Sequence, residues 1–488
     1  MRFLLLIIFF MEGNLLFAQN EGTLTLMNSL PQHLENNPSF IPKYNFSFTL
    51  PATSFSAFYS SNGFAYGDVI SKQSDGSTVA DLPKLRGALT EKNYLSQAFS
   101  VDLLRISFKV NDKLFMNLGT QGKGYSRVML PKDAVAILID GNQPASLSGS
   151  GSSNYTLSPQ VESVSYLETY LGAAYKLNND LTIGLRAKLL HGITNATTQN
   201  SNFNLSTDNA TYAISATAAA ELRTSGIYNL TQSNYSFRMG DYLSNSGFGV
   251  DLGATFKVTD KITVAASLLD IGSIHWQNNT YAYSLDAVKA KYTFSGFDLS
   301  KLVNNEQNYV ESITDSIANN FKFVESAIRS YSSTIPSRMY LNGTYQLRGQ
   351  LSVGAILFGE TFKGRTTTGI TLGLNKHFGK WFSLSGSYTV SSNAYNNVGL
   401  GFSLNLAVVQ FYMVGDNLLR IPISGNEING FVNSTQFFNI RTGMNFVFGW
   451  KPTKSSNVAK ADDFKVKGKK KTVKSTNGRA SDFRRRKK

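Results

Sequence analysis

Apolar and polar residues alternate strictly over many segments of the chain. In one segment the apolar residues share a single face, namely Val250, Leu252, Ala254, Phe256 and Val258. In another, hydroxyl side chains form a column, namely Ser383, Ser385, Ser387, Thr389 and Ser391. Successive side chains of a β-strand point to opposite faces of its sheet, so this period of two predicts strands rather than helices.

The connections between these segments are of two kinds. Tight turns are expected at Asn111-Asp112, Asn178–Asp180, Thr259-Asp260, Arg348-Gly349, Phe378–Lys380 and Ala407-Val408. Long polar stretches are expected at about 60–95, 127–161, 193–246, 272–337 and 420–435. Short turns at one end and long loops at the other are typical of outer-membrane β-barrels.

Strands that run upward and downward in turn predict an all-β fold, a 14-stranded antiparallel transmembrane β-barrel over residues 44–450. The strands are expected near 44–58, 97–110, 113–125, 162–176, 181–193, 247–258, 261–271, 337–347, 350–362, 366–376, 381–391, 398–406, 409–417 and 436–449. An even number places both ends of the barrel on the periplasmic side. A soluble β-sandwich would also alternate, but its inner faces should be richer in large aliphatic residues and its chain shorter.

Composition supports the membrane barrel. Charged residues are 16% of the chain and aromatic residues 12%, whereas soluble proteins carry roughly 25% charged residues. Beyond the N-terminus, no apolar run approaches the roughly 18 residues that a spanning helix needs. We therefore expect the outer membrane of a Gram-negative bacterium as the location, with membrane lipid as a partner of the barrel exterior.

The N-terminus predicts a signal peptide over residues 1–18. Arg2 supplies the positive charge, and Phe3–Met11 is an apolar stretch too short to span a bilayer. Cleavage is plausible after Ala18. The alternative is that the stretch forms a buried strand or helix of the mature protein.

Two of the long loops show helical signals. Apolar residues recur at three- and four-residue steps, namely Val310, Ile313, Ile317, Phe321, Val324, Ile328 and Tyr331. This spacing predicts an amphipathic helix, which we expect to pack on the barrel mouth as a lid rather than to bind a partner as a coiled coil. Residues Pro131–Asp140 form a second helical candidate, with Gly141-Asn142 as its stop signal.

Charged residues on the polar faces of the strands predict a lumen of mixed charge. The expected lumen charges are Arg105, Lys109, Arg186, Lys188, Asp251, Lys257 and Arg338, with Glu168 and Asp251 as the acidic partners. Two interpretations stay open: the charges pair with one another to fill a small lumen, or they form a selectivity ring.

Enzymatic chemistry finds little support, and we predict that the protein is not an enzyme and binds no cofactor. The chain has no cysteine, which excludes disulfides and cysteine-ligated metals. Its four histidines show no metal-ligand spacing. His191 with Ser206 or Asn204 could be drawn as a catalytic pair, but a solvated histidine at the rim is the simpler interpretation.

The last predicted strand ends in a pattern that outer-membrane barrels share. Arg441, Gly443, Phe446 and Phe448 match the order polar, glycine, aromatic, aromatic. Terminal strands of this kind resemble the segment read by the barrel-assembly machinery, which we expect as a partner. The alternative is an ordinary alternating strand with a chance glycine.

Residues 451–488 form a basic tail. They hold 15 Lys or Arg and 3 Asp or Glu, whereas the whole chain has a net charge of +15. The clusters are Lys469, Lys470, Lys471, Arg484, Arg485 and Arg486. With almost no apolar surface the tail is expected to be disordered and periplasmic, where it would meet an anionic cell-wall or protein partner and no nucleic acid.

Short motifs carry a family resemblance. The stretch Ser29–Gln32, followed by Asn36–Phe40 and Leu50-Pro51, resembles the start of the long-chain fatty-acid transporter-like barrels. The resemblance implies that residues 19–43 form a plug in the lumen, with Asn37, Pro38 and Phe40 in it. Five further motifs are similar to an uncharacterised family of Bacteroidota outer-membrane proteins, namely Tyr170–Gly172, Leu185–Lys188, Asp251–Ala254, Ser267–Gly272 and Asp416–Leu418.

Two functions from different classes follow. One is passive transport of a small or hydrophobic molecule through the barrel. The other is a structural or secretion-associated role, in which the barrel and its tail anchor partners; a sister group of the resembled superfamily serves as a shuttle in protein secretion. A continuous lumen, or an apolar lateral gap between strands, would favour the first function. A fully filled lumen would favour the second.

Overall fold

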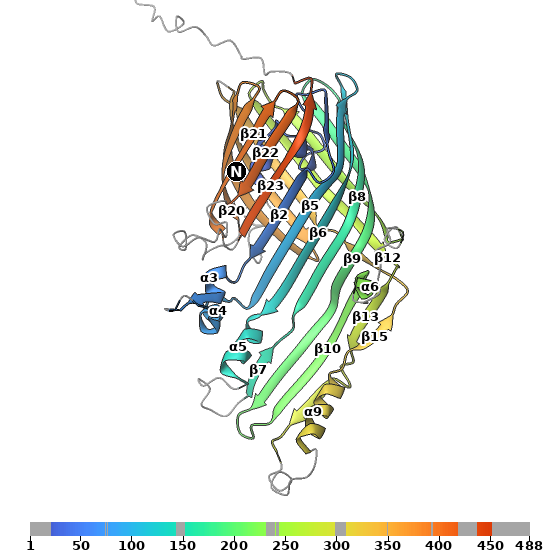
Figure 1. Ribbon diagram of the computed structural model, residues 1–488, viewed down its shortest axis with the longest axis vertical. Helices are drawn as coiled ribbons and strands as arrows, with labels where there is room; N and C mark the ends of the chain where they lie inside the picture. Colours follow the sequence, from blue (N-terminus) through green and yellow to red (C-terminus); the bar gives the residue numbers. More distant parts are fainter. Residues whose placement is uncertain are drawn as a thin grey trace, which may run out of the picture. The chain divides into compact units, whose positions relative to one another are not determined.

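The computed structural model describes residues 21–73, 75, 77–142, 152–230, 240, 244–297, 309–348, 350–391, 394–417 and 437–450. Its main sheet closes on itself into a barrel (Figure 1). No helix within these ranges is long and apolar enough to span a membrane. The predicted signal peptide (1–18) and basic tail (451–488) lie outside the described residues.

The barrel wall has 14 antiparallel strand positions, as the alternation predicted. In chain order these are β1 (Phe46–Thr49) with β2 (Ser54–Ser61), β5 (Lys92–Lys109), β6 (Leu114–Pro131), β8 (Gln160–Lys176), β9 (Leu181–Asp208), β11 (Ser246–Lys257), β12 (Ile262–Trp276), β17 (Ser337–Gln346), β18 (Leu351–Phe362), β19 (Arg365–Phe378), β20 (Phe382–Ser391), β21 (Ala394–Leu406), β22 (Val409–Asp416) and β23 (Phe437–Phe448).

The barrel closes between its first and last strands. β23 pairs with β1 and β2 on one side, through registers such as Phe48↔Phe446 and Ser54↔Gly443. β1 and β2 pair with β5 on the other side. The expected first strand at 44–58 is therefore interrupted. At the break, Ala52 has a φ of 57° and donates its backbone N–H to the carbonyl oxygen of Asp102.

The two faces of the wall differ as the alternation requires. Large apolar side chains are exposed on the outside, for example Leu252, Leu341 and Phe402. The hydroxyl column of β20 is buried inside, from Ser383 to Thr389. A closed barrel satisfies every ladder hydrogen bond and presents apolar side chains to lipid, which is how sheets cross bacterial outer membranes. The protein is a β-barrel of the outer membrane of a Gram-negative bacterium.

Tight turns lie together at one end of the barrel, which we call the short-turn end. The backbone N–H of Val110 donates to the carbonyl oxygen of Leu114, and Val258 donates likewise to Ile262. Ala407 and Gly379 take positive φ angles of 55° and 67° in two further turns. At the opposite, long-loop end the hairpin between β18 and β19 is also tight.

Part of the expected loop sequence is instead strand. β9 continues for 28 residues, far beyond the expected end at residue 193. It pairs with β10 (Ile214–Ser225) and β7 (Ser152–Thr156). The sheet extends through β13 (Thr280–Leu285), β14 (Lys291–Phe294), β15 (Val324–Ala327) and β16 (Tyr331–Thr334). Figure 1 shows this extension, which we call the arm, at the long-loop end.

The helix expected from residue 310 to 331 is only partly present. α9 spans Tyr309–Asn320, whereas Val324 lies in β15 and Tyr331 in β16. The helix lies against the arm, where Asn320 Nδ2 donates to the carbonyl oxygen of Lys291 at 3.1 Å. The prediction that this helix forms a lid on the barrel mouth is therefore wrong, because the helix contacts the arm instead.

Shorter helices occupy the other loops. The second predicted helix is present as α5 (Lys132–Asp140), and Gly141 follows it with a φ of 71°. α3 (Tyr66–Val69), α4 (Leu82–Ala88) and α6 (Ile227–Leu230) are short. β3 (Ile70–Lys72) and β4 (Thr78–Ala80) form a separate hairpin.

Sidedness can be tested with single cysteines, because the natural chain has none. Val288 is exposed in the turn between β13 and β14 of the arm, and Asp260 is exposed in a short turn. We expect Val288→Cys to react with an impermeant maleimide on intact cells, and Asp260→Cys to react only after permeabilisation. Labelling of Asp260→Cys but not of Val288→Cys on intact cells would show that the barrel has the opposite orientation.

Candidate functional site

Residues 21–43 fold inside the barrel and form its plug. They contain α2 (Gly22–Leu26) and a 3-10 helix, η2 (Pro31–Glu35), and every residue of both is buried. α2 packs against β19 to β22, where the hydroxyl of Thr23 donates to Asp416 Oδ1 at 2.5 Å. Ser29 Oγ lies 3.3 Å from the hydroxyl oxygens of both Ser383 and Ser403.

The resemblance named Asn37, Pro38 and Phe40 as plug residues, and the structure places all three in this segment. Asn37 Nδ2 donates to Thr255 Oγ1 at 3.0 Å. Pro38 lies directly on the backbone of Gly184, where an added Cβ would come within 2.2 Å of the Pro38 carbonyl carbon. Phe40 packs against the His33 ring, with 4.2 Å between the ring centroids.

Two glutamates of the plug meet arginines of the wall. Glu35 accepts hydrogen bonds from Arg105 and, at 2.9 and 3.0 Å, from Arg441. Glu21 accepts one from Arg441 at 2.7 Å. Burial alone would raise the pKa of Glu35, but Arg441 and Arg105 hold that pKa well below its ordinary value. The plug is therefore attached to the wall by ionised pairs.

A second group of charges lies beside the plug and centres on Lys188. Its Nζ is 2.7 Å from Asp251 Oδ1, 2.5 Å from Asp270 Oδ1 and 3.6 Å from Glu168 Oε1. All four side chains are buried. We call these four residues the Lys188 cluster.

Further cations surround this cluster. Lys123 contacts Glu168 at 2.8 Å, and Arg338 contacts Asp270 at 2.8 Å. Arg186 contacts Asp251 at 3.3 Å and donates to the carbonyl oxygen of Leu34 in the plug at 2.6 Å. Of the two interpretations of the lumen charges, this geometry corresponds to mutual pairing.

The prediction that Lys257 is a charge of the lumen is wrong. Lys257 is the last residue of β11 at the short-turn end, where its ammonium pairs with Asp260 at 2.7 Å. Both side chains are exposed to solvent, at 45% and 96%. The alternation gave its face correctly, but the strand ends before that face becomes enclosed. Lys109 at the end of β5 behaves similarly and pairs with the exposed Asp112.

Sequence reasoning missed Asp270 and the acidic plug residues. Asp270 takes a φ of 58° and follows the inward-facing Leu269, so two consecutive residues point into the lumen. The register between β11 and β12 shifts at this bulge. The break in alternation at Leu268-Leu269-Asp270 was a visible signal. Glu21 and Glu35 carried no such signal, because the plug has no periodic pattern.

An aromatic layer lies above the charges, toward the long-loop end. Its members are Tyr125, Tyr166, Trp276, Tyr331 and Phe362, all buried. Tyr125 and Phe362 pack edge to face, with ring centroids 5.0 Å apart.

Two small cavities lie on opposite sides of this layer. A cavity of about 40 Å³ lies between Tyr125 and the plug residue Glu35. A cavity of about 220 Å³ lies at the mouth, bordered by Phe362 and Arg127. The buried side chains of the aromatic layer thus lie between these two cavities.

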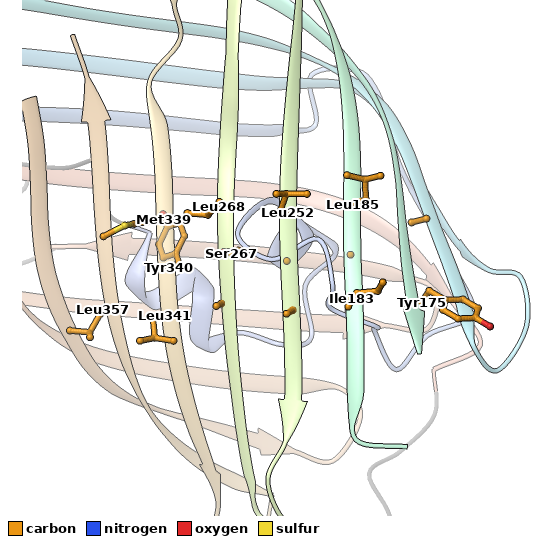
Figure 2. A pocket seen from close by; sticks show the side chains of 15 residues that line it. Tyr175, Ile183, Leu185, Leu252, Ser267, Leu268, Met339, Tyr340, Leu341 and Leu357 are labelled. Atoms are coloured by element: carbon orange, nitrogen blue, oxygen red, sulfur yellow. The ribbon is translucent and has the colours of Figure 1, made fainter. Parts of the chain in front are cut away.

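An apolar groove of about 990 Å³ lies on the wall at β8 to β18 (Figure 2). Figure 2 shows Leu185, Leu252 and Leu341 along it. Gly184 and Gly253, which also border the groove, are direct partners in the ladder between β9 and β11. The ladder is unbroken there, so the groove is not a lateral gap into the lumen.

The hypothetical catalytic pair is excluded by geometry. His191 and Ser206 belong to one continuous strand, β9. Fifteen residues of strand at about 3.3 Å each separate them by roughly 50 Å. The alternative partner Asn204 lies on the same strand. Within the described part of the chain, no three His, Asp or Glu side chains are grouped to hold a metal ion.

The terminal-strand residues divide between the two faces of β23. Phe446 stacks on Phe48 outside the barrel at 4.7 Å between centroids, and Phe448 is exposed beside it. Arg441 instead points into the lumen, between the two plug glutamates. That the assembly machinery recognises Arg441, Gly443 and the two aromatic residues stays a prediction.

The similarity of the chain to solved structures is remote. No curated protein matches the chain significantly. A solved FadL homologue of Pseudomonas aeruginosa is similar at 11% identity over 88% of this chain and 96% of that one, with a TM-score of 0.38. The Pseudomonas putida toluene transporter TodX is similar at 9% identity over 89% of this chain and 98% of that one, with a TM-score of 0.40. No functional conclusion follows from likeness at this level.

The family comparison is more extensive. A family described as "Family of unknown function (DUF5723)" matches residues 38–416, from the second half of the plug to the end of β22. Most of the chain lies within this match, and the protein belongs to this family.

Proposed function

We propose that the protein is a plug-gated channel for a small molecule, with residues 21–43 as the gate. The observation that carries the proposal is how the plug is attached. Every backbone–backbone hydrogen bond of the described plug joins two plug residues, for example Asn37 to His33. Each hydrogen bond observed between the described plug and the wall involves a side chain, as in Glu35 to Arg441 and Thr23 to Asp416. The plug can therefore leave without breaking the sheet.

The passage would run from the mouth cavity through the aromatic layer to the space that the plug vacates. The wall behind the plug is polar, with Ser383, Ser385 and Thr389 buried along β20. A polar lumen is what water-filled barrels present once open. Transport then requires two movements, of the plug and of the Tyr125–Phe362 pair.

A disulfide lock tests the gate. Ser29 of the plug and Ser403 of the wall have hydroxyl oxygens 3.3 Å apart, so cysteines there are close enough to bridge. We expect oxidised Ser29→Cys/Ser403→Cys barrels to give no swelling of proteoliposomes in small solutes. Reduction should restore the swelling of the unlocked protein.

A wall-to-wall bridge is the matched control. Ser47 and Ser107 lie on the adjacent strands β1 and β5, with hydroxyl oxygens 2.7 Å apart. The pair Ser47→Cys/Ser107→Cys introduces the same bond without holding the plug, and should swell equally when oxidised or reduced. Equal swelling of the plug pair in both states would show that the plug is not a gate.

A second candidate is an anchoring or secretion-associated role. The observation that favours it is the filled lumen, together with an arm built on the 28-residue β9. In this role the arm would bind a partner outside the cell. The basic tail, with Lys469–Lys471 and Arg484–Arg486, would bind an anionic periplasmic component. A barrel that stays impermeable with the plug pair reduced would support this candidate.

A further inference from the structure

The mouth cavity of about 220 Å³ has an unusual lining. It lies at the long-loop end, above the aromatic layer, and is bordered by Tyr94, Arg127, Met129, Gln160, Glu162, Thr198, Phe362, Lys363 and Arg365. Three of these side chains are cations and one is an acid. Its volume is below the roughly 300–1,000 Å³ of drug-sized pockets, so any ligand is small.

Arg365 is the cation without an acidic partner. No carboxylate of the described residues lies within 4.0 Å of it, whereas Lys363 has Glu162 at 3.5 Å and Arg127 has Glu360 at 3.5 Å. The Arg365 guanidinium instead stacks on the Tyr94 ring, 3.7 Å from its centroid. Stacking fixes the plane of the guanidinium and leaves its N–H edge available for an oxyanion.

The other two cations are already engaged in the wall. Lys363 donates to Thr197 Oγ1 at 2.7 Å. Arg127 donates to the hydroxyl oxygen of Tyr125 and to Ser96 Oγ at 3.3 Å. They contribute positive potential to the cavity, while the single acid Glu162 is shared with Lys363. The net charge of the lining therefore favours an anion.

Part of the remaining lining is apolar. Phe362 and Met129 are buried beside the cavity, and the face of Phe362 also carries the Arg127 guanidinium at 5.6 Å. An inorganic anion would satisfy Arg365 but leave this apolar surface uncovered. A ligand with a carboxylate at one end and a small apolar body at the other uses both parts.

We propose that the mouth cavity binds a small organic carboxylate, with its carboxylate on Arg365 and its apolar body against Phe362 and Met129. This rests on the proposed channel function and names the substrate class for it. The bound ligand contacts Phe362, one member of the Tyr125–Phe362 pair, at the first barrier of the passage.

Binding is tested by calorimetry on the full-length protein in detergent, with benzoate as the probe. We expect saturable binding of benzoate that Arg365→Gln weakens roughly tenfold or more, because a charge-assisted contact is lost. Benzamide, which has the same ring without the charge, and inorganic phosphate, which has the charge without the ring, should both bind more weakly than benzoate.

The matched control is Arg329→Gln. Arg329 is an exposed arginine on the arm, at the same end of the barrel. It should leave benzoate binding unchanged, and heat-modifiable migration on gels should confirm that both variants are folded. Equal benzoate affinity of Arg365→Gln and the natural protein, or equal affinity for benzamide and benzoate, would overturn the proposal.

The plug lock separates this proposal from the channel function. The oxidised Ser29→Cys/Ser403→Cys protein should bind benzoate normally, because the plug lies on the short-turn side of the aromatic layer and the mouth cavity on the other side. If the barrel binds benzoate but never conducts, the carboxylate site is supported and the channel function is contradicted. Conduction without benzoate binding would do the reverse.

Discussion

Lys188→Met is expected to prevent most of the barrel from reaching its folded, heat-resistant form. The substitution removes the cation that lies between Asp251, Asp270 and Glu168, all within 3.6 Å of its ammonium. Each carboxylate keeps at least one other cation, namely Lys123, Arg186 or Arg338, but loses its contact with the Lys188 ammonium. Breaking a buried ion pair by removing one partner typically costs about 3–5 kcal/mol. The folded fraction on unheated gels and the urea midpoint of refolded protein measure the loss.

Lys257→Met provides the control on the adjacent strand. Lys257 also pairs with an aspartate, but both side chains are exposed, and surface pairs contribute little. The same substitution there should leave the folded fraction and the urea midpoint unchanged. If both variants lose the same stability, burial of the Lys188 cluster is not what makes it important.

The barrel wall could be predicted because each wall strand has one face toward lipid and one toward the lumen. That contrast imposes the alternation seen in β11 and β20, and it sets the strand count. The arm could not be predicted in the same way. Where β9 continues beyond the wall, neither face meets lipid, so residues 194–208 are largely polar and their pattern predicts a loop.

The predicted helix extends beyond the end of α9 at Asn320, and the reason for this error is different. Val324, Ile328 and Tyr331 continue the helical spacing of the residues before them, and local pattern alone cannot end the helix there. The edge of β13 offers backbone partners to residues 324–327, and those ladder hydrogen bonds decide the conformation. A nonlocal partner of this kind leaves no mark in the segment itself.

The lumen was only partly predictable. Face assignment found Arg105, Arg186 and Lys188, because they sit on wall strands with clear alternation. Glu35, the partner of Arg105, and Glu21, a partner of Arg441, are on the plug, and only the family resemblance pointed to a plug at all. The charges of the lumen therefore make sense only when the two segments, remote in sequence, are placed together.

Gly184→Ala is expected to displace the second half of the plug while leaving the barrel intact. The added Cβ would lie 2.2 Å from both the carbonyl carbon of Pro38 and the backbone nitrogen of Ser39. These are backbone atoms that cannot rotate away, so the segment must move. Its hydrogen bonds to Thr255, at 3.0 Å from Asn37 and 2.7 Å from Ser39, are lost with it.

A thiol probe in the plug measures this displacement. Ser39→Cys is nearly isosteric, and Ser39 is only 1% exposed, so maleimide should label it slowly in an otherwise natural barrel. Adding Gly184→Ala should raise the labelling rate roughly tenfold or more, as would follow from a loss of at least about 1.4 kcal/mol of docking free energy. Proteoliposome swelling should increase in parallel.

Gly343→Ala makes the same change on β17 without touching the plug. Its nearest heavy atom would be Val264 Cγ1 at 3.9 Å, an ordinary contact. In the Ser39→Cys background this variant should label as slowly as the parent. Equal labelling of the two glycine variants would mean that the plug does not rest on Gly184. Faster labelling of Gly184→Ala without increased swelling would mean that the plug is displaced but the aromatic layer still closes the passage, and would assign the limiting barrier to Tyr125 and Phe362.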